Sequence, residues 1–197
     1  MEPIKIIKST CVPLPIENID TDQIIPARFL KAITREGFGD NLFRDWRYHS
    51  NGDPKPSFVL NQPHYQGSIL VAGKNFGCGS SREHAAWALY DFGFKVVVSS
   101  FFADIFRSNA LNNGLLPVQL PEEYIQDLLK ALQDNPSLEA VVDLPRQEFS
   151  VSGSDQAVGF EINPHKKSCL LQGFDDIDYL ISQKDKILEY EQIRITV

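Results

Sequence analysis

The chain has 197 residues, of which 23% are charged and 43% are hydrophobic, as in an ordinary soluble globular protein. Its net charge of −7 argues against nucleic acid as the main partner, because phosphate binding needs a basic surface. Since it shows neither a long apolar stretch nor a secretory signal, we expect one cytoplasmic domain over residues 1–197.

The first third of the chain has weak secondary-structure signals. Partial alternation of apolar residues predicts a short first strand at 4–9. Residues 16–31 (IENIDTDQIIPARFLK) begin acidic, and Pro26 limits any helix there. Residues 32–66 are rich in aromatic, charged, glycine and proline residues, which predicts a long surface loop that binds a ligand or orders on binding.

The rest of the chain is more regular. Apolar runs alternate with helical patterns, giving strands at 68–73, 95–99 and 116–120 and helices at 82–92, 103–112 and from Pro121 onward. This order implies parallel strands with helical crossovers. Short strands follow at 138–144, 148–152 and 157–162, then helices at 164–171 and 177–181 and a C-terminal helix and tail over 183–197. The fold class is therefore α/β, with parallel core strands and a C-terminal antiparallel addition.

The segment 73–90, GKNFGCGSSREHAAWALY, carries the strongest functional signal. Ser80-x-x-Glu83 has the form of a capping box, which predicts that the helix begins at the serines. A helix start offers unpaired N–H groups, and Arg82 adds a guanidinium able to grip a carboxylate with two hydrogen bonds. This predicts a binding site for a small carboxylate. The alternative is that a serine only caps the start of the helix.

Other polar residues have less specific interpretations. Cys78 lies near a helix start, but no histidine base is identifiable for it, so a spectator thiol is favoured. His84 is interpreted as a structural histidine rather than a base or ligand. The acidic run at 20–23 (DTDQ) offers carboxylates that pair with Arg28 or Arg82, or that are only solvated or capping.

The cysteines argue against disulfides and metal centres. Cys11, Cys78 and Cys169 are few, odd in number and far apart. Neither they nor the scattered histidines form a local motif for an iron–sulfur cluster or a structural zinc. We therefore expect no metal ligands in this chain.

Two segments resemble known signatures. GKNFGCGSSREHAAWAL resembles the signature of the swivelling domain of the aconitase superfamily, and NIDTDQIIPARFLK resembles the other signature of that domain. SFFADIFRSNALNNGLLPV and CLLQGFDDIDYL match in the same order, so the resemblance covers nearly the whole chain. Ala86 departs from the usual proline, and both residues are acceptable in a first helical turn. The resemblance implies a three-layer β/β/α fold.

The resemblance also implies an activity. It points to a lyase of leucine biosynthesis that interconverts 2-isopropylmalate and 3-isopropylmalate, both small dicarboxylates, by dehydration and rehydration. It implies that this chain binds no cofactor and that a large subunit, in a heterodimer or higher assembly, holds a [4Fe–4S] cluster. A related hydratase acting on citraconate, maleate or homoaconitate is one alternative, and a non-catalytic carboxylate-binding module is another.

Residue roles carry over by the same resemblance. Ser80 is the expected catalytic base and Arg82 the ligand of a substrate carboxylate. The helix terminus, Arg82 and the loop amides around 77–79 are expected to stabilise the serine alkoxide. Apolar Phe29 and Leu30 suit an isopropyl group. The residues expected to bind substrate are Gly79, Ser81, Asp22, Arg28, Phe29, Leu30 and Lys31.

Overall fold

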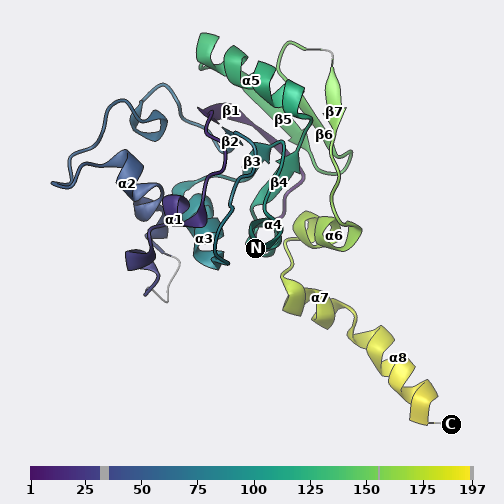
Figure 1. The fold of residues 1–197 in the computed structure, drawn as a ribbon. Coiled ribbons are helices and arrows are strands. Elements are labelled where there is room, and N and C mark those ends of the chain that lie inside the picture. The colour runs from purple at the N-terminus through teal and green to yellow at the C-terminus, as the bar shows by residue number, and fades with distance from the viewer. Residues whose placement is uncertain (32–35, 155, 196–197) are drawn as a thin grey trace.

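The computed structural model describes residues 1–31, 36–154 and 156–195, which fold around one sheet (Figure 1). The strands lie in the order β4-β3-β2-β1-β5-β6-β7. They are β1 (Ile6–Leu14), β2 (Ile69–Ala72), β3 (Val96–Ser99), β4 (Leu116–Gln119), β5 (Glu139–Asp143), β6 (Glu148–Val151) and β7 (Ala157–Gly159). Strands β1 to β4 pair in parallel, and β5 to β7 add antiparallel pairs. The predicted fold class is confirmed.

Strand β1 joins the parallel and antiparallel halves. Its residues 11–14 pair with β2, and its residues 6–10 pair with β5 on the other side. The predicted strand at 4–9 was therefore too short. The missed stretch is 10–14, and its residues 11–14 are all buried. A strand covered on both faces has no polar alternation to reveal it.

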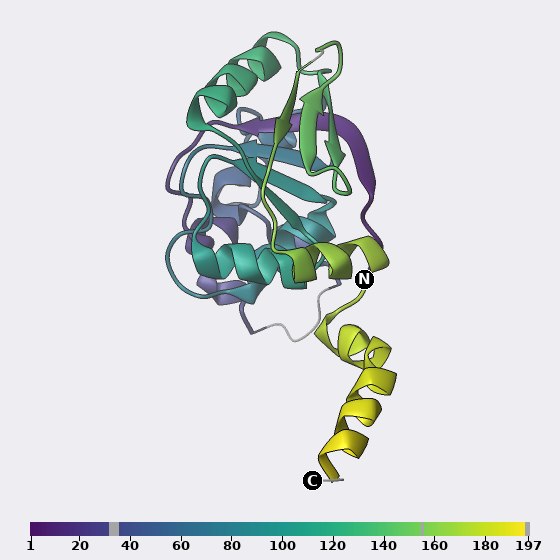
Figure 2. The same cartoon turned by 90° about the vertical axis from the view of Figure 1, so that its right-hand side faces the viewer.

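Helices and the antiparallel strands enclose both faces of the parallel strands (Figures 1 and 2). Side chains alternate along a strand, so neighbours in β2 and β3 enter different cores. One core joins Leu70, Ala72 and Val97 to helices α3 (Glu83–Phe92) and α4 (Asp104–Asn112). The other joins Val71, and the residues of β2 and β3 on the same face of the sheet, to helix α5 (Glu122–Asp134), β5 and β6. The layering agrees with the expected three-layer fold.

The segment predicted as a surface loop over 32–66 is partly core, which corrects that prediction. It contains helix α2 (Arg44–Arg47) and 3-10 turns at Phe38–Asn41 and Val59–Asn61. Phe38, Leu42 and Phe43 are buried in the core that α3 closes. Their irregular spacing among glycine and proline residues gave no periodic signal. Residues 32–35 lie outside the described part of the chain.

The last three helices begin on the body and then leave it. Helix α6 (Pro164–Gln172) lies beside α4, whereas α7 (Asp176–Ser182) and α8 (Lys184–Ile195) extend away (Figures 1 and 2). Asn163 caps α6 by accepting the N–H of His165 at 3.0 Å, and Gly173 ends it with a φ of 73°. Within the described residues, no helix is both long enough and apolar enough to cross a membrane.

Candidate active site

The two signature segments lie against each other. The Ile19 carbonyl accepts the N–H groups of Gly77 and Cys78 at 2.8 and 3.1 Å, and the Cys78 carbonyl accepts the N–H of Thr21 at 2.8 Å. Thr21 is buried, and its hydroxyl donates to the Ser80 carbonyl at 2.9 Å. These bonds fix helix α1 (Thr21–Ile24) against the serine loop.

Helix α3 begins at Glu83, not at the serines. Its N-cap is Arg82, in an extended conformation (φ −135°, ψ 105°) and with no side-chain capping bond. The Glu83 carboxylate accepts from Asn113 Nδ2 at 3.0 Å instead of reaching back to Ser80. The predicted capping box is therefore wrong, and a capping box forms at residues 20–23 instead, where it starts α1. The first N–H groups of α3 lack a side-chain cap, which suits an anion.

The serine loop presents polar groups to solvent. Gly79, Ser80 and Ser81 are exposed, and neither serine hydroxyl has a hydrogen-bond partner among the described residues. Of the loop amides around 77–79 that were expected to stabilise a serine alkoxide, those of Gly77 and Cys78 donate to the Ile19 carbonyl instead. The serine hydroxyls and the start of α3 are thus the groups left for a ligand.

Arg82 is held in place by Asp22. Its side chain is only 14% exposed, and its Nη1 contacts Asp22 Oδ1 across 60 residues of sequence. Asp22 lies in the first turn of α1. One nitrogen of the guanidinium is thereby anchored. Its other donors have no partner among the described residues, so they are available to a carboxylate. Pairing of the acidic run with Arg82 is confirmed.

Arg28 has a different partner. Its Nη1 donates to Asp45 Oδ2 at 3.0 Å and its Nη2 contacts the other carboxylate oxygen. This bidentate contact lowers the pKa of Asp45 and raises the pKa of Arg28. The guanidinium also lies 4.7 Å from the Phe29 ring centroid. Of the two arginines considered as alternative partners of the acidic run, Arg82 is therefore the one that pairs with it.

The predicted substrate residues fall into two neighbouring groups. Phe29 and Leu30 are half-buried against the core, and Lys31 is exposed. Among the described residues, no hydrogen bond or ion pair joins these three to the serine loop. The structure brings together the residues of the serine loop and its anchor, namely Gly79, Ser80, Ser81, Arg82 and Asp22.

Gly79 has a backbone conformation that only glycine adopts easily. Its φ is +88°, and an added Cβ would collide with the Asp20 carboxylate that caps α1. We expect Gly79→Ala to lower the free energy of unfolding by about 1–3 kcal/mol and to displace the serines, so that activity falls. Thermal unfolding and a turnover assay of the assembled enzyme measure the two effects.

Gly52→Ala is the matched control. Gly52 has a similar φ of +91°, but an added Cβ there meets no atom within 4 Å. It therefore reports the backbone strain without the collision. A Gly79→Ala variant no less stable and no less active than Gly52→Ala would contradict this account of the loop.

The two remaining polar residues near the loop agree with their conservative interpretations. Burial raises the pKa of the Cys78 thiol, and the negative charge of Asp20 raises it further, so the thiolate is disfavoured. The His84 ring packs against Phe38 and Trp87, with centroid separations of 5.5 and 4.6 Å. The raised pKa of Cys78 and the ring contacts of His84 favour these interpretations over a catalytic role.

A second cluster of chemically capable residues lies elsewhere and was missed from the sequence. His165 Nε2 lies 3.7 Å from Cys169 Sγ and 3.8 Å from Asp176 Oδ1. The available signal was the H-x-x-x-C spacing, which places both side chains on one helical face. Asp176 follows the turn at Gly173, so no periodicity connects it to that pair.

Known proteins resemble this chain over nearly its whole length. Residues 1–123 match the aconitase C-terminal domain family. The 3-isopropylmalate dehydratase small subunit of Cytophaga hutchinsonii is 63% identical over 192 residues, covering 98% of this chain and 96% of the relative. That of Christiangramia forsetii is 57% identical over 194 residues, covering 98% and 95%. A solved 3-isopropylmalate dehydratase from Methanocaldococcus jannaschii superposes with a TM-score of 0.67 at 26% identity, covering 95% of this chain and 99% of that one.

Proposed function

The chain belongs to the 3-isopropylmalate dehydratase small subunits of the aconitase C-terminal domain family, and we propose that its serine loop forms half of an active site. As a hydro-lyase subunit of leucine biosynthesis, it has a large subunit as its partner. One observation supports the proposal above all. Ser80 is exposed, its hydroxyl has no hydrogen bond among the described residues, and it lies two positions before an anchored Arg82 at the uncapped start of α3.

Arg82 would bind a substrate carboxylate. Dehydration removes a proton alpha to a carboxylate, so negative charge builds on that group in the transition state. Because Asp22 already fixes the guanidinium, it needs little reorganisation to stabilise this charge. The first N–H groups of α3 add a partial positive charge at the same place.

Ser80 would take the proton. A serine hydroxyl is a poor base at its ordinary pKa, and only its alkoxide serves. Arg82 and the start of α3 favour the alkoxide, whereas the carboxylates of Asp20 and Asp22 oppose it. We therefore expect the large subunit to complete the positive charge around Ser80, which makes the isolated chain inactive.

The [4Fe–4S] cluster expected of this superfamily does not fit this chain. Such a cluster needs several cysteines together. Cys11, Cys78 and Cys169 lie on separate elements, and no group of three cysteines gathers among the described residues. We assign the cluster to the large subunit, where it would supply a Lewis acid for the departing hydroxyl. The assembly would be a cytoplasmic heterodimer or a multiple of it.

A substrate panel on the reconstituted pair tests the assignment. Isopropylmalate is expected to give the highest kcat/KM, because the resemblance assigns apolar Phe29 and Leu30 to the variable substituent of the substrate, and neither side chain can pair with a third carboxylate. Homoaconitate, maleate and citraconate should each be poorer. A higher kcat/KM for any of these three would move the chain to a sister hydratase.

A further inference from the structure

Helix α6 presents a histidine and a cysteine one turn apart. His165 and Cys169 are at positions i and i+4, which share one helical face. Cys169 is only 3% exposed, and its Sγ faces His165 Nε2 at 3.7 Å. The His165 ring also packs edge to face against Tyr179, at a centroid separation of 4.3 Å. Both side chains are thus fixed before any ligand arrives.

Asp176 brings a third donor of a different kind. It is the first residue of α7, and its Oδ1 lies 3.8 Å from His165 Nε2. The three donor atoms all lie within 4.8 Å of one another. In a tetrahedral zinc site, bonds of 2.0–2.3 Å place such atoms roughly 3.5 Å apart. The observed separations therefore need only small side-chain adjustments to close on a metal ion.

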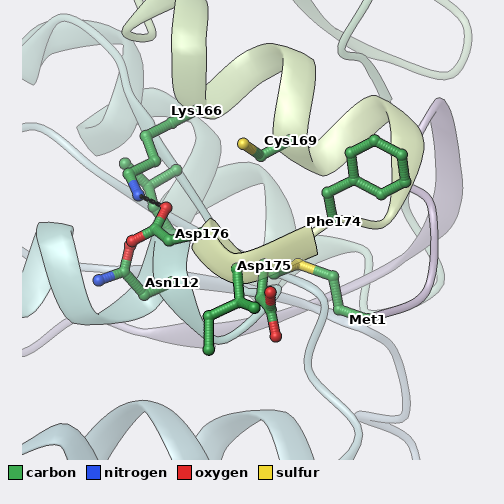
Figure 3. Close-up of a pocket in the computed structure, with 9 residues that line it drawn as sticks. Met1, Asn112, Lys166, Cys169, Phe174, Asp175 and Asp176 are labelled. Atoms are coloured by element: carbon green, nitrogen blue, oxygen red, sulfur yellow. Dashed lines mark hydrogen bonds and ion pairs between the residues drawn. The ribbon is translucent and has the colours of Figure 1, made fainter. Parts of the chain in front are cut away.

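Two of the three donor residues border a cavity. Cys169 and Asp176 line a space of about 220 Å³ between α6 and α7 (Figure 3). Figure 3 shows the Cys169 sulfur directed into this space from α6, with Asp176 opposite it. Asp175 lies on the same wall. There is room for a metal ion together with a water as its fourth ligand.

We propose that His165, Cys169 and Asp176 form a binding site for a divalent transition metal of the zinc type. A set of one sulfur, one nitrogen and one oxygen donor suits Zn²⁺ or Co²⁺ better than Mg²⁺ or Ca²⁺, which prefer oxygen alone. The site lies where α7 leaves the body (Figure 1). Metal binding would therefore tie the C-terminal helices to α6.

Lys166 competes with the metal. Its Nζ lies 2.6 Å from Asp176 Oδ1, the same oxygen that faces His165. An ammonium group in that position occupies the carboxylate when no metal is bound. A metal ion must displace it, so this lysine weakens the affinity. This competition provides a test. Removing the lysine charge should strengthen metal binding if the three residues are ligands, and should not do so if they serve only the structure.

Cobalt titration of the full-length, chelator-treated chain tests the site. Co²⁺ bound to a thiolate gives a sulfur-to-metal charge-transfer band, and we expect one Co²⁺ per chain, displaced by Zn²⁺. Cys169→Ser should abolish the band, and His165→Gln should weaken binding by about tenfold or more. Lys166→Met should strengthen it, because the competing charge is gone.

The control is Cys78→Ser, which removes a more exposed thiol and should leave the band unchanged. His165 is partly exposed, so His165→Gln is expected to fold even if Cys169→Ser does not. The proposal is overturned if the wild-type chain gives no band or if Cys78→Ser abolishes it. Weaker binding by Lys166→Met would overturn it as well.

Discussion

Replacing Ser80 by alanine is expected to lower kcat of the assembled enzyme by about 10²–10⁴-fold, the usual contribution of a general base. The chain should still fold and bind its partner. The Ser80 hydroxyl is exposed and makes no hydrogen bond within the described residues, so its removal leaves no buried group unsatisfied. Steady-state kinetics and co-purification with the large subunit measure the two outcomes.

Ser152→Ala is the matched control for that experiment. Ser152 is an exposed serine that directly follows β6, and its hydroxyl has no bond in the described structure. It should keep full activity. A near-normal kcat for Ser80→Ala would remove this residue from the mechanism. Loss of assembly in that variant would mean that the hydroxyl serves the interface instead.

Replacing Arg82 by lysine is expected to lower kcat/KM by roughly 30–150-fold, corresponding to about 2–3 kcal/mol for a charge-assisted pair. Lysine keeps the positive charge but lacks the planar fork, so it cannot hold Asp22 and a substrate carboxylate together. Both a higher KM and a lower kcat should result, because the contact strengthens in the transition state.

Two further variants separate binding from positioning. Asp22→Asn leaves Arg82 charged but loosens its anchor, so we expect a smaller loss of kcat/KM with little change in thermal stability. Arg146→Lys is the neutral control, since Arg146 is exposed and lies on the β5–β6 connection. Activity of Arg82→Lys equal to that of Arg146→Lys would contradict a role for the guanidinium fork.

Strong periodic or apolar runs predicted their elements well. The strands at 69–72, 96–99 and 116–119 are buried at every position except Gln119, and the helices between them begin and end within a residue or two of the predicted bounds. Gly93 ends α3 with a φ of 117°, as its position in the sequence indicated. These elements depend on local pattern and burial, which a sequence displays directly.

Features that depend on distant partners could not be predicted in the same way. The capping box at Ser80 failed because Thr21 holds the Ser80 carbonyl and Asn113 takes the Glu83 carboxylate. Both partners are at least 30 positions away. The motif resemblance pointed to Ser80 and Arg82 as site residues. It left two arginines as possible partners of the acidic run, and the structure shows that Arg82 is the partner. A local motif predicts the wrong hydrogen bond wherever a tertiary contact offers the same group a better partner.

Turnover of 3-isopropylmalate by three samples tests the central claim most directly. The samples are this chain alone, a cluster-loaded large subunit alone, and their mixture. We expect activity in the mixture only, with kcat rising to a plateau as this chain is titrated in. Turnover by the isolated, metal-free chain would contradict the account. So would tight isopropylmalate binding by the isolated chain combined with no association between the subunits, which would make it a carboxylate-binding module.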